Sequence, residues 1–502
     1  MNGQWVTSRQ RDFRGGETQA RLPEEVGRNQ LIRMENAMLY PSGELTAAHQ
    51  TDTEVITGAT LGVCIVNFTD GTYNVFSAPG NGIVYGQFFE TSLESPVQMA
   101  LGSQASVVGS RIVGAHKSIR FLNKEYCPNP NDDNTKDGIL NLTDFTLINI
   151  PAGGVASKLR LYANRLWLIS TTGELRNSNN GDASVWNPLN IMLLANSEPI
   201  VDFHPVPGGA IVYSATAIYA MYGTTYQDIS FIPLMQGKRF TTASVEVGGI
   251  VYILSSEGVY QVALNGAQLI PHHQETFFED NHGIFADPAK ILTAFYLQAF
   301  RAIVFTWPDA YSVGGKSLVF YLSGAYSKLN KLLPSAFPYA VALNDKNTDF
   351  LWGTSAGVFA KSQYPSANTL IPYESIVQTR HEDCNSYRDK VWNEFVLTFG
   401  EVVYGVTIEA MLDESTDRIM IVSGNGCRKG DNTFYLDDLP RSKTISMVIT
   451  INNGDPVTLA SDDNIEDLLT DENGNMLTAA INPGNWTLKA MRLRYRDAGP
   501  VL

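Results

Sequence analysis

Short apolar runs separated by turn dipeptides fill the middle of the chain. An apolar run at 63–68 is followed by Asp70-Gly71 and then by a second run at 73–76. Aspartate followed by glycine accepts the positive φ angles that a tight hairpin turn requires. The pattern therefore predicts a strand, a hairpin turn and a second strand.

Pairs of this kind return along the chain, while long amphipathic helical patterns are almost absent. Their spacing is roughly 40–50 residues, which is typical of propeller blades that hold several strands each. We therefore predict an all-β protein in which residues 46–372 form a degenerate β-propeller of about six blades. The later pairs lie at 158–176, 210–223, 249–262, 301–321 and 349–360.

Two regions depart from this period. Residues 1–45 are polar, contain Gly15-Gly16 and six arginines, and predict an extended N-terminal arm. From residue 373 onward the apolar segments are longer, and apolar and polar residues partly alternate within them. This pattern predicts a β-sandwich-like domain over 373–502. The acidic stretch 437–475 predicts a solvated loop region.

Composition and charge narrow the class of protein. The chain has 502 residues, with 36 basic and 51 acidic side chains and a net charge of −15. This balance argues against a protein that clamps nucleic acid, because phosphate binding needs a basic surface. Hydrophobic residues make up 44% of the chain, which excludes intrinsic disorder for most of its length.

Export and membrane signals are not found in the sequence. The first residues lack the apolar segment of a signal peptide, and no apolar run approaches the ~18 residues that would span a bilayer. We therefore expect no membrane-spanning segment and assembly in the cytoplasm. The widely spaced cysteines predict buried or idle thiols in a reducing compartment, namely Cys64, Cys127, Cys384 and Cys427.

Two segments could hold a metal ion, but a simpler interpretation is preferred for each. Residues 271–282 carry three histidines and several acids, yet the spacing is not that of a zinc motif, so we expect an inter-blade loop. Residues 133–144 follow the calcium-loop order only in part and are explained by a turn. Motifs for a serine nucleophile or a phosphate loop do not occur. We predict no catalytic residue, no metal and no cofactor, and a protein that is not an enzyme.

Four stretches, read in order, carry a resemblance to a known family. Asp12-Phe13-Arg14-Gly15-Gly16 opens the first stretch, which closes at Gly43-Glu44-Leu45. The others lie at 164–186, 218–223 and 258–260. Together they resemble the tail nozzle proteins of short-tailed bacteriophages, also called tail tubular protein B, which are related in role to packaged-DNA stabilisation proteins.

The resemblance implies a structural virion protein of the tail, assembled in the host cytoplasm. Copies of the chain would form a homohexameric ring below the portal and the head-to-tail adaptor and continue the DNA channel. The ring would retain the packaged genome, contact the DNA transiently and release it during ejection, with tail fibres or spikes docked around it. An acidic lumen agrees with this role, because it repels phosphate.

The resemblance also suggests assembly residues, and it leaves alternatives open. The N-terminal arm would dock on a neighbouring subunit or on the adaptor, although an unstructured tail explains the same composition. A glycan-binding or glycan-cleaving propeller, such as a receptor-binding tail component, is the alternative function. A host-encoded interaction propeller is a third. The candidate assembly residues are Asp12, Phe13, Gly15, Gly16, Pro23, Asn36 and Gly43, and Trp167 and Trp186 are predicted to be blade core.

Overall fold

The structure is a computed structural model of the chain, and the part of the chain that it describes is nearly all β. Its described residues form forty strands and one helix. They are 5–14, 16–17, 30–48, 50–51, 62–67, 72–77, 84–89, 114–129, 138–141, 146–150, 156–195, 197–272, 274–287, 292–308, 315–333, 338–343, 350–354, 359–363, 373–382, 388–413, 415–453 and 486–498.

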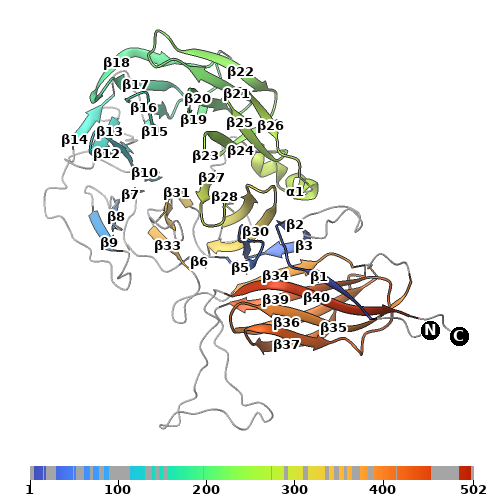
Figure 1. The fold of residues 1–502 in the computed structure, drawn as a ribbon. Coiled ribbons are helices and arrows are strands. Elements are labelled where there is room, and N and C mark those ends of the chain that lie inside the picture. Colours follow the sequence, from blue (N-terminus) through green and yellow to red (C-terminus); the bar gives the residue numbers. More distant parts are fainter. Residues whose placement is uncertain are drawn as a thin grey trace, which may run out of the picture.

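Seven four-stranded units form a β-propeller within these residues (Figure 1). The innermost strands of successive units contact one another in the order β15, β19, β23, β27 and β31, and β31 contacts β10 of the first unit. Because the last unit meets the first, the units close into a ring. The prediction of an all-β propeller is therefore confirmed by the topology.

The strands of the seven blades follow chain order with two exceptions, β10 and β6. Blade 1 holds β7 (Gly62–Asn67), β8 (Thr72–Ser77), β9 (Val84–Phe89) and β10 (Gly114–Lys117), and blade 2 holds β11 (Ile119–Phe121), β12 (Lys124–Asn129), β13 (Gly138–Asn141) and β14 (Thr146–Asn149). Blade 3 holds β15 (Ala156–Tyr162), β16 (Arg165–Ser170), β17 (Leu175–Asn179) and β18 (Asp182–Met192), and blade 4 holds β19 (Ile200–Val206), β20 (Gly209–Ser214), β21 (Ala217–Tyr222) and β22 (Ser230–Gln236).

The remaining blades complete the ring. Blade 5 holds β23 (Phe240–Val247), β24 (Ile250–Ser255), β25 (Val259–Ala263) and β26 (Gly266–Leu269), and the helix α1 (Glu275–Phe285) follows it. Blade 6 holds β27 (Thr293–Leu297), β28 (Ala302–Pro308), β29 (Gly315–Tyr321) and β30 (Tyr326–Leu333). Blade 7 holds β31 (Pro338–Leu343), β32 (Phe350–Thr354), β33 (Phe359–Gln363) and, at its outer edge, β6 (Gln50–Thr51).

The propeller has seven blades, whereas the sequence predicts about six. The six strand pairs that the pattern singles out fall in blades 1 and 3 to 7. The additional unit is blade 2, whose strands are three to six residues long and include the polar segment Lys124–Asn129. Such short, polar strands give a weak hydrophobic alternation, and the residues between them match a turn more closely than a blade.

The remaining strands form a β-sandwich beside the propeller (Figure 1). We call its first sheet the front sheet. In order across the sheet, its strands are β38 (Gly430–Tyr435), β35 (Lys390–Phe399), β40 (Thr487–Asp497), β5 (Leu45–Ala47) and β4 (Ala37–Leu39). Strand β1 (Val6–Gln10) also pairs with β40. The second sheet of the sandwich contains β2 (Gly16–Glu17), β3 (Gln30–Glu35), β34 (Tyr373–Thr379), β39 (Ile445–Asn453), β36 (Val403–Leu412) and β37 (Ile419–Cys427).

The N-terminal segment differs from the extended arm that the sequence predicts over 1–45. Its described residues form strands in both sheets of the sandwich, with β1, β4 and β5 in the front sheet and β2 and β3 in the second. The physical reason is a set of apolar side chains spread between the arginines and glycines. They are fully or almost fully buried and comprise Phe13, Leu31, Met34, Ala37, Met38, Leu39 and Leu45.

Strand β3 joins the two domains into one continuous sheet. On one side it pairs antiparallel with β34, and on the other it makes a parallel pair with β30 of blade 6. The second sandwich sheet and blade 6 therefore form a ten-stranded sheet. One hydrophobic core spans the junction, because Phe13 and Met34 belong to the same cluster as Val304 of blade 6 and Trp392 of the sandwich.

Truncation of Phe13 tests this junction. Its side chain has no exposed surface, so Phe13→Ala leaves a cavity, and we expect a loss of about 3–5 kcal/mol in the free energy of unfolding. Urea denaturation followed by tryptophan fluorescence measures the loss. Val6→Ala is the matched control, because Val6 lies in the same segment but is 46% exposed, and we expect a change within about 0.5 kcal/mol. Equal effects of the two variants would contradict the assignment of Phe13 to a shared core.

Candidate functional site

The predicted assembly residues that the structure describes meet within the chain itself, at the junction of propeller and sandwich. The backbone N–H of Phe13 donates to the carbonyl oxygen of Gly43 at 3.0 Å, so the start of the motif is held against its end. The carboxylate of Asp12 accepts from the backbone N–H of Arg14 at 2.9 Å. Gly43 has φ of +92°, and a Cβ there would lie 2.7 Å from Oδ1 of Asp12. Only glycine fits this close turn.

Gly16 and Glu17 connect the same motif to blade 6. Gly16 has φ of +60°, and a Cβ there would lie 2.7 Å from the carbonyl oxygen of Tyr326. The Glu17 carboxylate forms an ion pair with Lys328 and accepts from the backbone N–H of Met34 at 3.0 Å. Burial is the main influence on the pKa of Glu17 and raises it, although Lys328 opposes this shift. A buried, paired carboxylate therefore anchors β2 to both β3 and β30.

Asn36 forms the turn between β3 and β4. Its φ is +51°, a left-handed conformation that asparagine tolerates better than most residues. Its side-chain amide donates to the carbonyl oxygen of Glu374 at 2.8 Å, and its own carbonyl accepts from the hydroxyl of Ser375 at 2.7 Å. Asn36 thus binds the turn to β34 of the sandwich.

These contacts change the interpretation of the motif. Asp12, Phe13, Gly16, Asn36 and Gly43 are brought together as internal determinants of the junction between the two domains. Gly15 and Pro23 lie outside the described residues. Docking of this segment on a neighbour or an adaptor stays a prediction.

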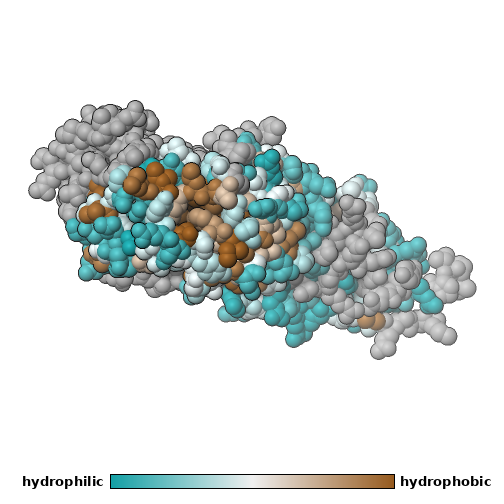
Figure 2. All heavy atoms as spheres, turned by 90° about the horizontal axis from the view of Figure 1, so that it is seen from above, coloured by the Kyte–Doolittle hydropathy of each residue, from teal (hydrophilic) through white to brown (hydrophobic). Residues whose placement is uncertain are grey.

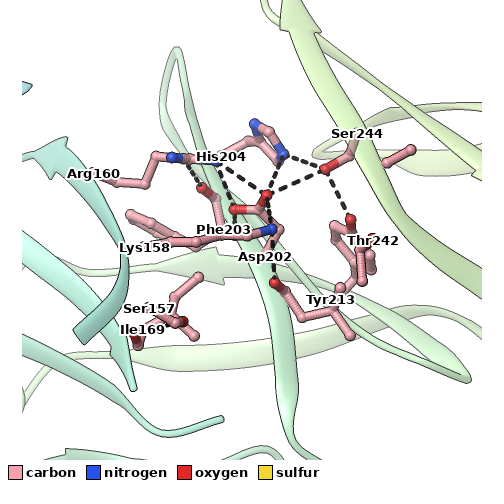
Figure 3. Close-up of polar contacts among 12 residues, drawn as sticks. Ser157, Lys158, Arg160, Ile169, Asp202, Phe203, His204, Tyr213, Thr242 and Ser244 are labelled. Atoms are coloured by element: carbon pink, nitrogen blue, oxygen red, sulfur yellow. Dashed lines mark hydrogen bonds and ion pairs between the residues drawn. The ribbon is translucent and has the colours of Figure 1, made fainter. Parts of the chain in front are cut away.

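A second polar cluster, which the sequence patterns did not single out, joins blades 3, 4 and 5 (Figure 3). Lys158 and Arg160 lie on β15, Asp202 and His204 on β19, and Ser244 on β23. These strands are the innermost of their blades, and each contacts the next. Tight packing of consecutive inner strands is what brings the side chains together.

Asp202 lies at the centre of the cluster, and its side chain is 4% exposed. Lys158 Nζ lies 2.7 Å from its Oδ2, and Arg160 Nη2 lies 2.9 Å from its Oδ1. Burial raises the pKa of the Asp202 carboxyl, but the charges of Arg160 and Lys158 more than offset this and hold the pKa well below its usual range. Asp202 is therefore an ionised counter-charge and a weak base.

His204 and Ser244 extend the cluster to blade 5. Nε2 of His204 lies 2.7 Å from the Ser244 hydroxyl, which also accepts from the Tyr213 hydroxyl at 2.8 Å. Burial lowers the pKa of His204 to about 4, so the imidazole is neutral at pH 7. Asp202 approaches the same Nε2 atom at 3.7 Å rather than the other ring nitrogen. In a Ser-His-Asp relay the carboxylate holds Nδ1 while Nε2 faces the serine, so this arrangement ties blades together and does not activate a nucleophile.

The other sequence candidates have structural explanations where they are described. His272 lies before α1, with Nε2 2.7 Å from the carbonyl oxygen of Glu257, and Nδ1 accepts from the backbone N–H of Gln274.

The described residues contain no group of three or more His, Cys, Asp or Glu side chains that could hold a metal ion. Residues 133–137 and 142–144 of the calcium-like segment lie outside the described part. Trp167 and Trp186 are buried in the blades as predicted, and no described helix is long and apolar enough to cross a bilayer.

Removal of the Asp202 charge tests the inter-blade role. Asp202→Asn leaves two cations without their shared counter-charge, and we expect a loss of about 2–3 kcal/mol in the free energy of unfolding at pH 7. The expected loss is smaller than for a fully buried ion pair, because the side chains of Lys158 and Arg160 are 31% and 30% exposed. Asp417→Asn, at an exposed position, is the control for chemical denaturation. A loss no larger than the control's would contradict the role.

The neutral state of His204 predicts a specific pH dependence. The unfolded chain protonates this imidazole near the ordinary histidine pKa of 6.5, whereas the folded chain does so at a pKa of about 4. The unfolded state therefore binds more protons within this window, and stability falls as the pH is lowered through it, by about 3 kcal/mol in total. His204→Gln should remove this contribution to the dependence of the unfolding free energy on pH. His282→Gln, at an exposed position, should retain it. Equal slopes for both variants in urea titrations from pH 7 to pH 4 would refute the assignment.

Comparisons with known proteins give matches at the level of structure alone. No protein-family model and no curated protein matches the chain. The chain is similar to a virginiamycin B lyase from Staphylococcus aureus, with a TM-score of 0.41 and 9% identity, covering 64% of this chain and 98% of the lyase. It is similar to a chain of the mitotic checkpoint complex with the same TM-score and identity, covering 63% of this chain and 91% of that one.

Proposed function

We propose that the chain is a structural subunit of a short-tailed bacteriophage tail, a nozzle protein without catalytic activity. In this proposal copies of the chain form a homohexameric ring below the portal and adaptor and continue the DNA channel. The ring retains the packaged genome until ejection, and tail fibres or spikes dock around it. The protein resides in the virion after assembly in the host cytoplasm.

The observation that carries this proposal is the role of the N-terminal motif. The first of the four stretches that resemble the nozzle family joins the propeller to the sandwich, through Phe13, Gly16, Asn36 and Gly43. A subunit in a channel wall must resist the force of packaged DNA without hinging between its domains. A ten-stranded sheet that runs through both domains supplies this stiffness.

Surface properties give further support. The net charge of −15 favours a wall that repels DNA in transit. Exposed apolar side chains also gather on the outer side of blades 3 and 4, which Figure 2 shows from above. Surfaces of this kind mark sites that an assembly covers. The exposed apolar side chains of these two blades include Val185, Leu189, Leu193 and Ile232, and those at 185 and 189 lie on β18.

Immunogold electron microscopy of phage particles tests the proposal directly. An antibody raised against the recombinant chain is applied to particles from the source lysate, and we expect gold at the distal end of a short tail. Pre-absorption of the antibody with the recombinant chain is the control and should abolish the label. Gold on peripheral fibres would favour a receptor-binding component instead. Intact tails without label, with gold only in soluble material, would reject a virion role.

A further inference from the structure

The outer face of the front sheet carries a group of arginines. Arg9 on β1 pairs in register with Arg492 on β40, and Arg494 and Arg496 follow at alternate positions along β40. The residues between them, Leu493 and Tyr495, point into the core and are buried. The four arginines therefore share the side of the sheet that faces away from the core. We call this surface, together with Trp5 and Tyr435, the arginine face.

Ion pairs join two of the four arginines of this face to acidic side chains. Arg492 forms an ion pair with Asp431, and Arg494 lies 3.5 Å from Glu394. Among these side chains and their ion-pair partners, four arginines thus stand against two acids, and Arg9 lies directly across from Arg492. Like charges at directly opposed positions destabilise a strand pair. An acidic partner bound to this face would relieve that repulsion.

The residue types of this face are those that dominate protein–protein interfaces. Trp5 lies below two guanidinium groups, at 4.8 Å from Arg496 and 5.6 Å from Arg494. Tyr435 is 70% exposed, and its strand β38 forms the edge of the same sheet. Arginine, tryptophan and tyrosine are the side chains most enriched among residues that carry binding energy. A protein partner with an acidic surface therefore fits this face.

The helix α1 offers such a surface on the same chain. Its inner side is buried through Phe277, Phe278 and Phe285. Its outer side exposes Glu275, Glu279 and Asp280, and the helix contains no lysine or arginine. Glu275 and Glu279 are four residues apart, and like charges at this spacing destabilise a helix. The helix thus presents a negative surface, opposite in sign to the arginine face.

We propose that the arginine face of one copy binds the acidic surface of α1 on a second copy. The proposal rests on the ring assembly proposed above and identifies its interface. Figure 1 shows α1 on the propeller and β1 with β40 on the sandwich, so each copy presents the two surfaces on different domains. A contact between two different surfaces of identical subunits is head-to-tail, and it closes into a ring when the rotation allows.

Charge reversal tests the interface without harming the fold. Arg9→Glu places a carboxylate opposite Arg492, which should favour the strand pair. Glu279→Arg places a cation four residues after Glu275, which should favour the helix. Each variant should therefore keep or raise the melting temperature while it weakens self-association by roughly tenfold. The variant that carries both reversals should regain the association of the unmodified chain.

Sedimentation velocity of the full-length chain over a concentration series measures the association, at about 50 mM and about 500 mM salt. Lys429→Glu and Asp417→Arg are matched controls at exposed positions and should associate like the unmodified chain. Higher salt should weaken association of the unmodified chain.

Three results would overturn the interface: an unmodified chain that stays monomeric, single reversals that leave association unchanged, or a double reversal as weak as the single ones. Gold at the tail tip together with any of these would leave the nozzle function standing and reject only this interface.

Discussion

The pairing of β3 on both of its edges determines how the two domains are arranged. Its antiparallel register with β34 and its parallel pair with β30, through Glu35 and Lys328, link the sandwich to blade 6 by backbone pairing. Glu17 strengthens the junction between the domains, because its buried carboxylate depends on the ion pair with Lys328. Separation of the domains would expose that charge pair and the shared apolar core together, and both exposures cost free energy.

The polar cluster around Asp202 fixes the positions of blades 3, 4 and 5 relative to one another within the propeller. Apolar packing between blades is not directional, and it tolerates small shifts of one inner strand along the next. The hydrogen bonds and ion pairs around Asp202 do not tolerate such shifts, since two cations from β15 must meet one carboxylate from β19. The aromatic contact of Trp167 with Phe203, at 5.5 Å, supplies the apolar part of the same interface. Polar groups thus fix the register that apolar side chains stabilise.

Sequence patterns predicted much of the fold but little of the candidate sites. Strand pairs with clear apolar runs, such as those around Trp167 and Tyr260, lie where the pattern placed them. Blade 2 was not recognised, because its strands are short and polar. The N-terminal strands were missed because arginines and glycines dominate the composition of a segment whose core residues, such as Phe13 and Met34, are far apart. The Asp202 cluster gave one weak signal, namely charges at alternate positions of an apolar strand. Its partners come from three blades, and no local pattern shows which inner strands will touch.

Closure of blade 7 by β6 has a consequence for the exchange of strands between copies. Thr51 pairs with Ser362, and β1 pairs with the last described strand, β40. Strands β1 and β6 therefore precede by a long stretch of chain the strands with which they pair. Until their partners are in place, β3 and β6 carry unpaired backbone edges, which are templates for pairing with other chains. Because the two members of each pair lie far apart in the chain, the same pairing between two copies is the route by which N-terminal strands are exchanged.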